Sequence, residues 1–391
     1  MSATDLSGAP WLERAETQAI LAALDGELRR TRAVGGAVRD TVMGLEGRES
    51  PDIDLATEMT PEQVIERAEA AGIAHYPTGI AHGTVTLRLG ETLAEVTTLR
   101  QDVETDGRHA VVRFGRDWKA DASRRDFTIN ALYCAADGTL YDPLGGLPDA
   151  LAGRVRFIGV PAERIAEDGL RVYRFFRFSA SHGGENLDPD GLAACADAVG
   201  RLGHLSAERV GGEMLRLLAL GRVTRTLGAM AAVGLLDADE PVLRRLAHYE
   251  ALGGRGMPAR LVLLGIDLDA LKERWRLSNE VVRVARSVRQ AAELMERERV
   301  AEAAYRCGEA AVEGLAVAAA EREWQRERVA EMARELGRLV VRRMPVSGDD
   351  LAGLGVPPGP AMGREIARLE QAFIDSGFSL TKEELLARAG S

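Results

Sequence analysis

Three stretches in the first third of the chain decide the fold: VGGAVRD at Val34–Asp40, PDIDL at Pro51–Leu55 and RRDFTINAL at Arg124–Leu132. The first begins at the end of a strand expected over 31–34 and runs through a glycine pair into a helix. The second alternates like a strand, in which residues two apart point to one face. Together they predict one sheet domain whose polar residues gather around a common site.

Asp52 and Asp54 are the candidate catalytic and metal-binding residues. On a strand both face one way, while Ile53 and Leu55 face the core. Two carboxylates this close repel each other unless a cation lies between them. A site made only of oxygen ligands suits Mg²⁺ better than zinc, and it can activate the attacking oxygen of a phosphoryl transfer. A DxD sequence alone is usually a solvated strand end, but its position after the glycine turn favours the metal site.

The glycine turn at Gly35 and Gly36 precedes a helix expected over 37–45. Glycine lets the backbone approach a ligand closely, and a helix N-terminus attracts phosphate. Arg39 can add a bidentate contact to that phosphate. Asp40 is expected to orient Arg39 or to cap the helix rather than to bind metal. The pattern is neither a Walker loop nor a dinucleotide-binding fingerprint.

The third stretch is expected to bury its apolar residues and to project Arg125, Asp126 and Asn130 towards the site. Arginine neutralises triphosphate charge, and Asp126 can accept hydrogen bonds from ribose hydroxyls. The residues expected to be buried are Phe127, Ile129 and Leu132. Few chemistries need a phosphate-binding turn, a carboxylate pair and a basic clamp together, and nucleotidyl transfer is the leading one.

GGAVRD, the downstream DID and RRDFTINAL resemble the first motifs of the class II tRNA nucleotidyltransferases. That family includes CCA-adding enzymes and bacterial poly(A) polymerases, and it belongs to the polymerase-β-like superfamily. YDPLGG at Tyr141–Gly146 resembles the family's hinge, EDGLRVYRFFR at Glu167–Arg177 its EDxxRxxR motif, and SAERVGGEMLR at 206–216 a later neck motif. The resemblance is dense over residues 30–220.

The resemblance implies an α+β protein with a polymerase-β-like nucleotidyltransferase head, made of a mixed sheet with helices, followed by an all-helical neck, body and tail. The expected parts are a catalytic head over 1–150, a base-recognising neck over 151–222, an RNA-binding body over 223–344 and a tRNA-binding tail over 345–391. A Pro/Gly-rich connector at Gly353–Gly363 is expected before a helical segment at Arg364–Phe373.

By the same resemblance, Asp168 and Arg171 read the incoming base, while Arg174 and Arg177 steady the helix or touch phosphates. Their spacing of three places all four on one side of an expected helix. An aspartate acceptor beside an arginine donor can match the polar edges of cytosine and adenine. The alternative is an ordinary amphipathic helix with a salt-bridge ladder that includes Glu167 and Arg171. In this helix Gly169 departs from the family pattern, at a cost of about 0.5–1 kcal/mol relative to alanine.

Glu95 lies on a strand expected beside the DID strand, where it is a third metal ligand or the partner of an arginine such as Arg100. Residues 100–121 are polar and lack periodicity, so a loop is expected there. In the family a flexible loop in this region helps to switch specificity from CTP to ATP, which the resemblance carries to about residues 100–115. His109 is expected to be solvated or to face RNA.

The composition fits a cytoplasmic protein of several domains. The chain has 391 residues, three scattered cysteines, no long apolar run and no secretion signal in its first residues. Its net charge of −10 is unusual for an RNA-binding protein, although net charge does not fix local potential. Residues 108–125 hold six basic residues against two acidic ones, and Arg338, Arg342 and Arg343 form another basic group.

The expected reaction is template-independent, Mg²⁺-dependent transfer of CMP, CMP and AMP from CTP and ATP to the 3′ end of tRNA, with release of pyrophosphate. The expected partners are tRNA, at its acceptor end and elbow, and nucleoside triphosphates, without a membrane or an obligate protein partner. Two alternatives stay open. One is a poly(A) polymerase, or an enzyme that adds only CC or only A. The other is a catalytically silent RNA-binding protein on the same scaffold.

Overall fold

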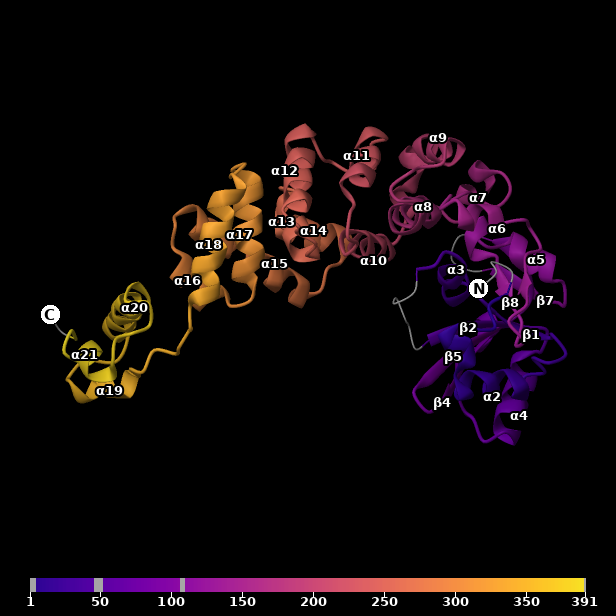
Figure 1. Cartoon of the computed structure of the whole chain (residues 1–391), viewed down its shortest axis with the longest axis horizontal. Coiled ribbons are helices and arrows are strands. Elements are labelled where there is room, and N and C mark those ends of the chain that lie inside the picture. Colours follow the sequence, from indigo (N-terminus) through magenta and orange to yellow (C-terminus); the bar gives the residue numbers. More distant parts are fainter. Residues whose placement is uncertain (1–4, 46–51, 106–109, 390–391) are drawn as a thin grey trace. The chain divides into compact units, whose positions relative to one another are not determined.

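The structure, a computed structural model, describes residues 5–45, 52–105 and 110–389 (Figure 1). The chain divides into two compact units. Unit 1 comprises Met1–Leu205 with Val233–Leu235, and unit 2 comprises Ser206–Ala232 with Leu236–Ser391. The four-part division expected from the sequence stays a prediction.

The core of unit 1 is a sheet of seven described strands in the order β3-β4-β5-β2-β1-β8-β9. Strands β2 and β5 pair in parallel and the other neighbours pair antiparallel, so the predicted mixed sheet is confirmed. The strands are β1 Thr31–Val34, β2 Asp52–Thr57, β3 Ala74–Gly79, β4 Thr84–Leu89, β5 Thr92–Thr98, β8 Tyr133–Cys134 and β9 Leu140–Tyr141.

Strand β2 alternates as its sequence predicts. Ile53 and Leu55 are buried, whereas Asp52 and Asp54 are exposed. Helices α2 (Ala15–Ala23) and α4 (Pro61–Ala70) contact strands β4 and β5, which gives the sheet its helical cover. Both carboxylates therefore stand on a strand whose apolar residues are fixed in the core.

The loop expected over 100–121 is wrong for its described residues, because 100–105 and 110–114 are paired strands and 118–121 belong to a helix. Strands β6 (Arg100–Thr105) and β7 (Ala110–Phe114) pair antiparallel in a separate two-stranded sheet. A polar hairpin that has no third strand carries little of the periodicity by which a strand is recognised. Its root is closed, since Gly115 N donates to Leu99 O (2.9 Å) and Leu99 N donates to Thr57 O (2.7 Å). His109 lies outside the described residues.

The helix expected to carry Asp168 and Gly169 is interrupted there. Helix α7 (Pro161–Glu167) ends before Asp168, whose backbone is extended, and α8 (Leu170–His182) starts after Gly169. The Asp168 carboxylate accepts from the backbone N–H of Leu170 (3.0 Å), a local bond that competes with helix continuation. A Cβ on Gly169 would lie 2.9 Å from Leu202 Cδ2, so a larger residue here would have to displace the end of the Leu202 side chain. The cost expected for glycine inside a helix does not arise.

Each of the other helices of unit 1 packs against strands or against other helices of that unit (Figure 1). They are α1 Pro10–Glu13, α3 Gly36–Val42, α5 Trp118–Ser123, α6 Leu147–Leu151 and α9 Pro189–Ala198. Between β9 and α6 the chain has no regular structure over 142–146, as its proline and glycines predict.

The described residues of unit 2 form only helices and their connections, as the resemblance implies. Helix α20 begins at Pro360, four residues before its predicted start, because proline fits the first turn of a helix. None of the described helices is long and apolar enough to cross a membrane. The helices are α10 Ala207–Leu218, α11 Thr224–Ala232, α12 Glu240–Ala251, α13 Met257–Leu263, α14 Leu268–Trp275, α15 Asn279–Glu296, α16 Val300–Cys307, α17 Ala310–Glu321, α18 Arg326–Arg338, α19 Gly348–Gly353, α20 Pro360–Asp375 and α21 Lys382–Leu386.

Candidate active site

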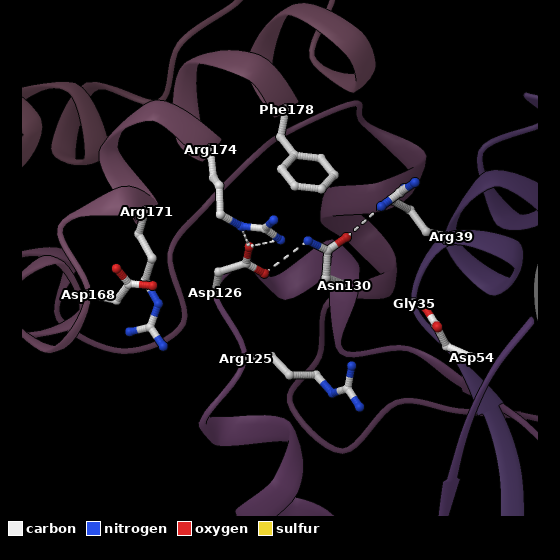
Figure 2. A pocket seen from close by; sticks show the side chains of 11 residues that line it. Gly35, Arg39, Asp54, Arg125, Asp126, Asn130, Asp168, Arg171, Arg174 and Phe178 are labelled. Atoms are coloured by element: carbon white, nitrogen blue, oxygen red, sulfur yellow. Dashed lines mark hydrogen bonds and ion pairs between the residues drawn. The ribbon is translucent and has the colours of Figure 1, made fainter. Parts of the chain in front are cut away.

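A polar cavity of about 390 Å³ lies within unit 1 (Figure 2). Of the residues predicted for the site, all but Asp52 and Arg177 line it, and Phe178 lines it as well. The described residues that line it are Gly35, Gly36, Arg39, Asp54, Arg125, Asp126, Asn130, Asp168, Arg171, Arg174 and Phe178. The cavity thus joins four segments of the sequence, which are the glycine turn, β2, the RRDFTINAL stretch and the start of α8.

The acidic side of the cavity is Asp54, with Asp52 on the same face of β2. Gly35 has a φ of +77°, and a Cβ there would lie 3.0 Å from Asp54 Oδ2, so the turn requires glycine. Loss of hydration and the neighbouring Glu95 carboxylate raise the pKa of Asp54. The part of this shift that comes from Glu95 is repulsion between carboxylates, which a bound cation would relieve.

Glu95 is the cross-strand partner of Asp54 in the parallel pair β2–β5. Its side chain is exposed, as is that of Asp54. Among the described residues, no group of three or more acidic, histidine or cysteine side chains is placed to hold a metal ion. The carboxylate pair on β2 therefore remains the candidate metal site, and a direct role of Glu95 in metal binding stays open.

A chain of hydrogen bonds runs along the cavity from Arg174 through Asp126 and Asn130 to Arg39 (Figure 2). Arg39 Nη1 donates to Asn130 Oδ1 (2.8 Å), and Asn130 Nδ2 donates to Asp126 Oδ1 (2.9 Å). Arg174 donates to Asp126 Oδ2 through Nε (2.8 Å) and pairs with the same oxygen through Nη2 (2.7 Å). Burial acts to raise the pKa of Asp126, but Arg174 and Asn130 hold it below its usual value. Asp126 is thus an ionised carboxylate that links α8 to the RRDFTINAL stretch.

Aromatic packing fixes α8 against that stretch. The ring centroid of Phe127, which is fully buried, lies 5.5 Å from that of Phe178. Two guanidinium groups also contact the ring of Phe178. The Cζ atoms of Arg39 and Arg174 lie 5.1 Å and 5.2 Å from the ring centroid. The Cζ atom of Arg177 lies 4.3 Å from the centroid of the same ring, but Arg177 does not line the cavity. The predicted burial of Phe127, Ile129 and Leu132 is confirmed.

Asp121 is a site-supporting residue that the sequence reasoning missed. It is 1% exposed and accepts from Arg124 Nε (2.8 Å), Arg125 Nη2 (3.1 Å) and the Tyr133 hydroxyl (2.9 Å). Although burial acts to raise its pKa, the two arginines keep it below the usual value. The spacing of three and four residues to Arg124 and Arg125 was the available signal, provided that α5 was recognised as a helix.

The two residues expected to read the base both line the cavity, and each is held locally. Arg171 donates to the carbonyls of Arg164 (2.8 Å) and Arg124 (3.1 Å) and pairs with Glu167 at 2.7 Å. Arg171 therefore forms the Glu167 salt bridge expected for an ordinary amphipathic helix and also lines the cavity, as expected for a base-recognising residue. Base recognition by Asp168 and Arg171 stays a prediction.

Comparison with known proteins decides the family. A family model described as "Poly A polymerase head domain" matches residues 31–156, and one described as "Probable RNA and SrmB- binding site of polymerase A" matches 186–245. The chain is 32% identical over 375 residues to a CCA-adding enzyme of Limosilactobacillus fermentum, an alignment that covers 91% of this chain and 92% of that enzyme. This chain belongs to the CCA-adding enzyme family.

Other members of the family agree in sequence and in fold. The chain is 38% identical over 263 residues to the mitochondrial CCA tRNA nucleotidyltransferase 1 of Danio rerio. That alignment covers 64% of this chain and 60% of the zebrafish protein. A crystal structure of the Bacillus stearothermophilus CCA-adding enzyme in complex with CTP superposes with a TM-score of 0.77 at 28% identity and covers 96% of this chain and 98% of that one.

Proposed function

We propose that this protein adds CMP, CMP and AMP from CTP and ATP to the 3′ end of tRNA and releases pyrophosphate. The observation that carries the proposal is the cavity in unit 1, where the glycine turn, the RRDFTINAL stretch and the start of α8 meet beside Asp54. The likeness to CCA-adding enzymes along most of the chain gives it independent support.

The carboxylates of Asp52 and Asp54 would hold Mg²⁺. Both are oxygen donors on one face of β2, and the pKa of Asp54 is raised by loss of hydration and by repulsion from Glu95, the second of which a divalent cation would offset. When bound, Mg²⁺ supplies activation of the terminal 3′-hydroxyl of the RNA and charge stabilisation at the leaving group. In the reaction, the 3′ oxygen forms a bond to the α-phosphorus as the bond to pyrophosphate breaks, and the hydroxyl proton is released.

The remaining residues of the cavity bind and orient the nucleotide. Arg39 and Arg125 line the same cavity as Asp54 and bring positive charge to the triphosphate (Figure 2). Gly35 and Gly36 leave room for close approach of the phosphates. Asp126 accepts from the ribose, with Asn130 and Arg174 as its fixed partners.

Asp168 and Arg171 would read the base from the start of α8, so that the protein acts as the template. The pair provides an acceptor and a donor at one wall of the cavity. A site of this kind rejects bases that leave a buried polar group unpaired. Arg177, which packs over Phe178, would steady α8. By resemblance, the helices of unit 2 would hold tRNA, and the segment 100–115 would assist the change from CTP to ATP.

The test is extension of tRNA that lacks its 3′ CCA, with CTP alone, ATP alone, both, or UTP and GTP, in the presence of Mg²⁺. We expect two residues from CTP alone and termination after CCA when both are supplied. A long tail from ATP alone would identify a poly(A) polymerase instead. Absence of any extension, together with retained RNA binding, would favour the silent binding protein.

A further inference from the structure

The cavity-facing side of α8 ends at a histidine that the proposed function does not use. Arg174, Phe178 and His182 are four residues apart, so they follow one another along one face of the helix. The first two line the cavity, whereas His182 lies beyond it and is 9% exposed. Its Nε2 atom lies 3.0 Å from Oδ1 of Asp40, a residue 142 positions earlier on helix α3.

The partners of His182 define the direction of this hydrogen bond. Burial acts to raise the pKa of Asp40, but hydrogen bonds from His182 and Arg39 lower it, so the group is a carboxylate that only accepts. Nε2 must therefore carry the hydrogen. The other ring nitrogen, Nδ1, lies 2.6 Å from the Ser181 hydroxyl, whose second acceptor, the Phe178 carbonyl, is farther away at 3.4 Å, so the hydroxyl donates to Nδ1. The assignment of the tautomer thus rests on the chemistry of its two neighbours.

The same oxygen of Asp40 orients Arg39, the residue that is predicted to bind phosphate. Asp40 Oδ1 accepts from Arg39 Nε at 2.8 Å, while Arg39 Nη1 donates to Asn130 at 2.8 Å. These two bonds fix the plane of the guanidinium group at two of its three nitrogens. The third nitrogen, Nη2, is the atom nearest to where a Cβ on Gly36 would lie, at 3.7 Å. It is therefore presented to the glycine turn, where the cavity is open.

We propose that His182 is a positioning residue for phosphate binding, because through Asp40 it fixes the plane in which Arg39 presents Nη2 to the phosphates of a nucleotide. The inference rests on the proposed function for the nature of the ligand. Without the donor at residue 182, Asp40 is no longer anchored to α8, so the plane of the Arg39 guanidinium is held by Asn130 but no longer fixed through Nε. Loss of the charge-assisted hydrogen bond between His182 and Asp40 is expected to weaken the binding of phosphate groups by about tenfold.

The test compares His182→Leu, His182→Gln and the matched control His204→Leu in the full chain. His204 is exposed and contacts only the nearby Arg201 carbonyl among its described hydrogen bonds. Calorimetry gives the Kd of CTP, ATP and pyrophosphate, and ligand-observed NMR gives that of cytidine. We expect His182→Leu to raise the Kd of CTP, ATP and pyrophosphate about tenfold and to leave that of cytidine within about twofold. His182→Gln, whose amide can donate from a position near Nε2, should recover most of the affinity, and the control should match the wild type.

Several results would overturn the proposal. Unchanged pyrophosphate binding in His182→Leu would do so, and an equal loss for cytidine and pyrophosphate would indicate general loosening of α8. If His182 acts through Arg39, adding His182→Leu to Arg39→Gln should have no further effect, and additive losses would contradict the coupling. Should His182→Leu fail to fold, Ser181→Ala is expected to raise the Kd of pyrophosphate about threefold, and no change would count against the proposal.

The outcome also separates this inference from the function on which it rests. A wild-type protein that binds CTP and pyrophosphate, with a His182→Leu variant that binds them equally well, would sink the positioning role alone. A wild-type protein that binds neither would refute the proposed function, and the positioning role would fall with it.

Discussion

Replacing Asp121 by asparagine tests whether one buried carboxylate supports the basic side of the cavity. The side chain receives donors from Arg124, Arg125 and Tyr133 and is almost fully buried. Asparagine has the same shape and keeps one acceptor oxygen. Its amide nitrogen, however, would face a guanidinium group, so that two donors oppose each other in a buried position.

The expected loss is large because two ion pairs share this carboxylate. Removing one partner of a buried ion pair costs about 3–5 kcal/mol, and water at the partly exposed arginines reduces this to about 2–4 kcal/mol in the free energy of unfolding. The Arg124 and Arg125 side chains are 17% and 19% exposed. The pKa of Asp121 is lower in the folded chain than its usual value. Its contribution is therefore present above the unfolded pKa of about 3.9 and is lost as the pH falls through the folded pKa.

Hydrogen exchange in peptides spanning α5 and β8 measures the local opening free energy at pH 7, and urea unfolding followed by circular dichroism compares neutral with acid pH. Asp137→Asn is the matched control, since its ion pair with Arg29 is more than half exposed and should change stability by less than about 1 kcal/mol. A loss below about 1 kcal/mol for Asp121→Asn, or a loss that is as large below pH 4 as at pH 7, would refute the reasoning.

Three further substitutions test the proposed chemistry. Asp52→Ala should lower nucleotide addition by more than about 100-fold while the circular dichroism spectrum is unchanged. Loss of a residue that only supports a metal ligand already costs about 10–100-fold, and loss of the ligand itself should cost more. Retained incorporation would contradict the assignment of Asp52 as a metal ligand. Arg171→Ala should reduce discrimination against UTP and GTP by about tenfold or more in competition assays, because a charged hydrogen bond is lost, and unchanged discrimination would end the template role. Gly35→Ala should strain the backbone by about 1–3 kcal/mol at a positive φ and crowd Asp54, so kcat/KM for CTP should fall, and wild-type kinetics would contradict the packing.

The parts of the site that the sequence predicted are those governed by local stereochemistry. The alternation of DIDL places both carboxylates on one face of β2 whatever surrounds the strand, and the glycine pair marks a turn by its own backbone freedom. The sequence also predicted β1 at 31–34 with the bounds that the structure has. In these three cases the sequence pattern and the local structure are set by the same few neighbouring residues.

The parts that the sequence did not predict depend on distant neighbours. His182 meets Asp40 across 142 residues, a contact that no local pattern announces. Asp168 lies outside the helix, where its side chain accepts from the backbone N–H of Leu170, and Gly169 packs closely against the side chain of Leu202. The hairpin of β6 and β7 was missed because two strands that pair only with each other show little of the periodicity by which a strand is recognised.

The closed root of that hairpin has a consequence for how the family can vary. Gly115 and Leu99 are tied together by one hydrogen bond and Leu99 to the end of β2 by another, so the ends of the intervening segment are fixed on the sheet. Insertions or deletions between them would lengthen or shorten the hairpin without shifting the register of β5 against β2. Loop closure entropy rises only slowly with length, so such changes are tolerated at small thermodynamic cost. The segment from 100 to 114 is thus a place where related chains can diverge in length while the carboxylates of β2 stay where they are.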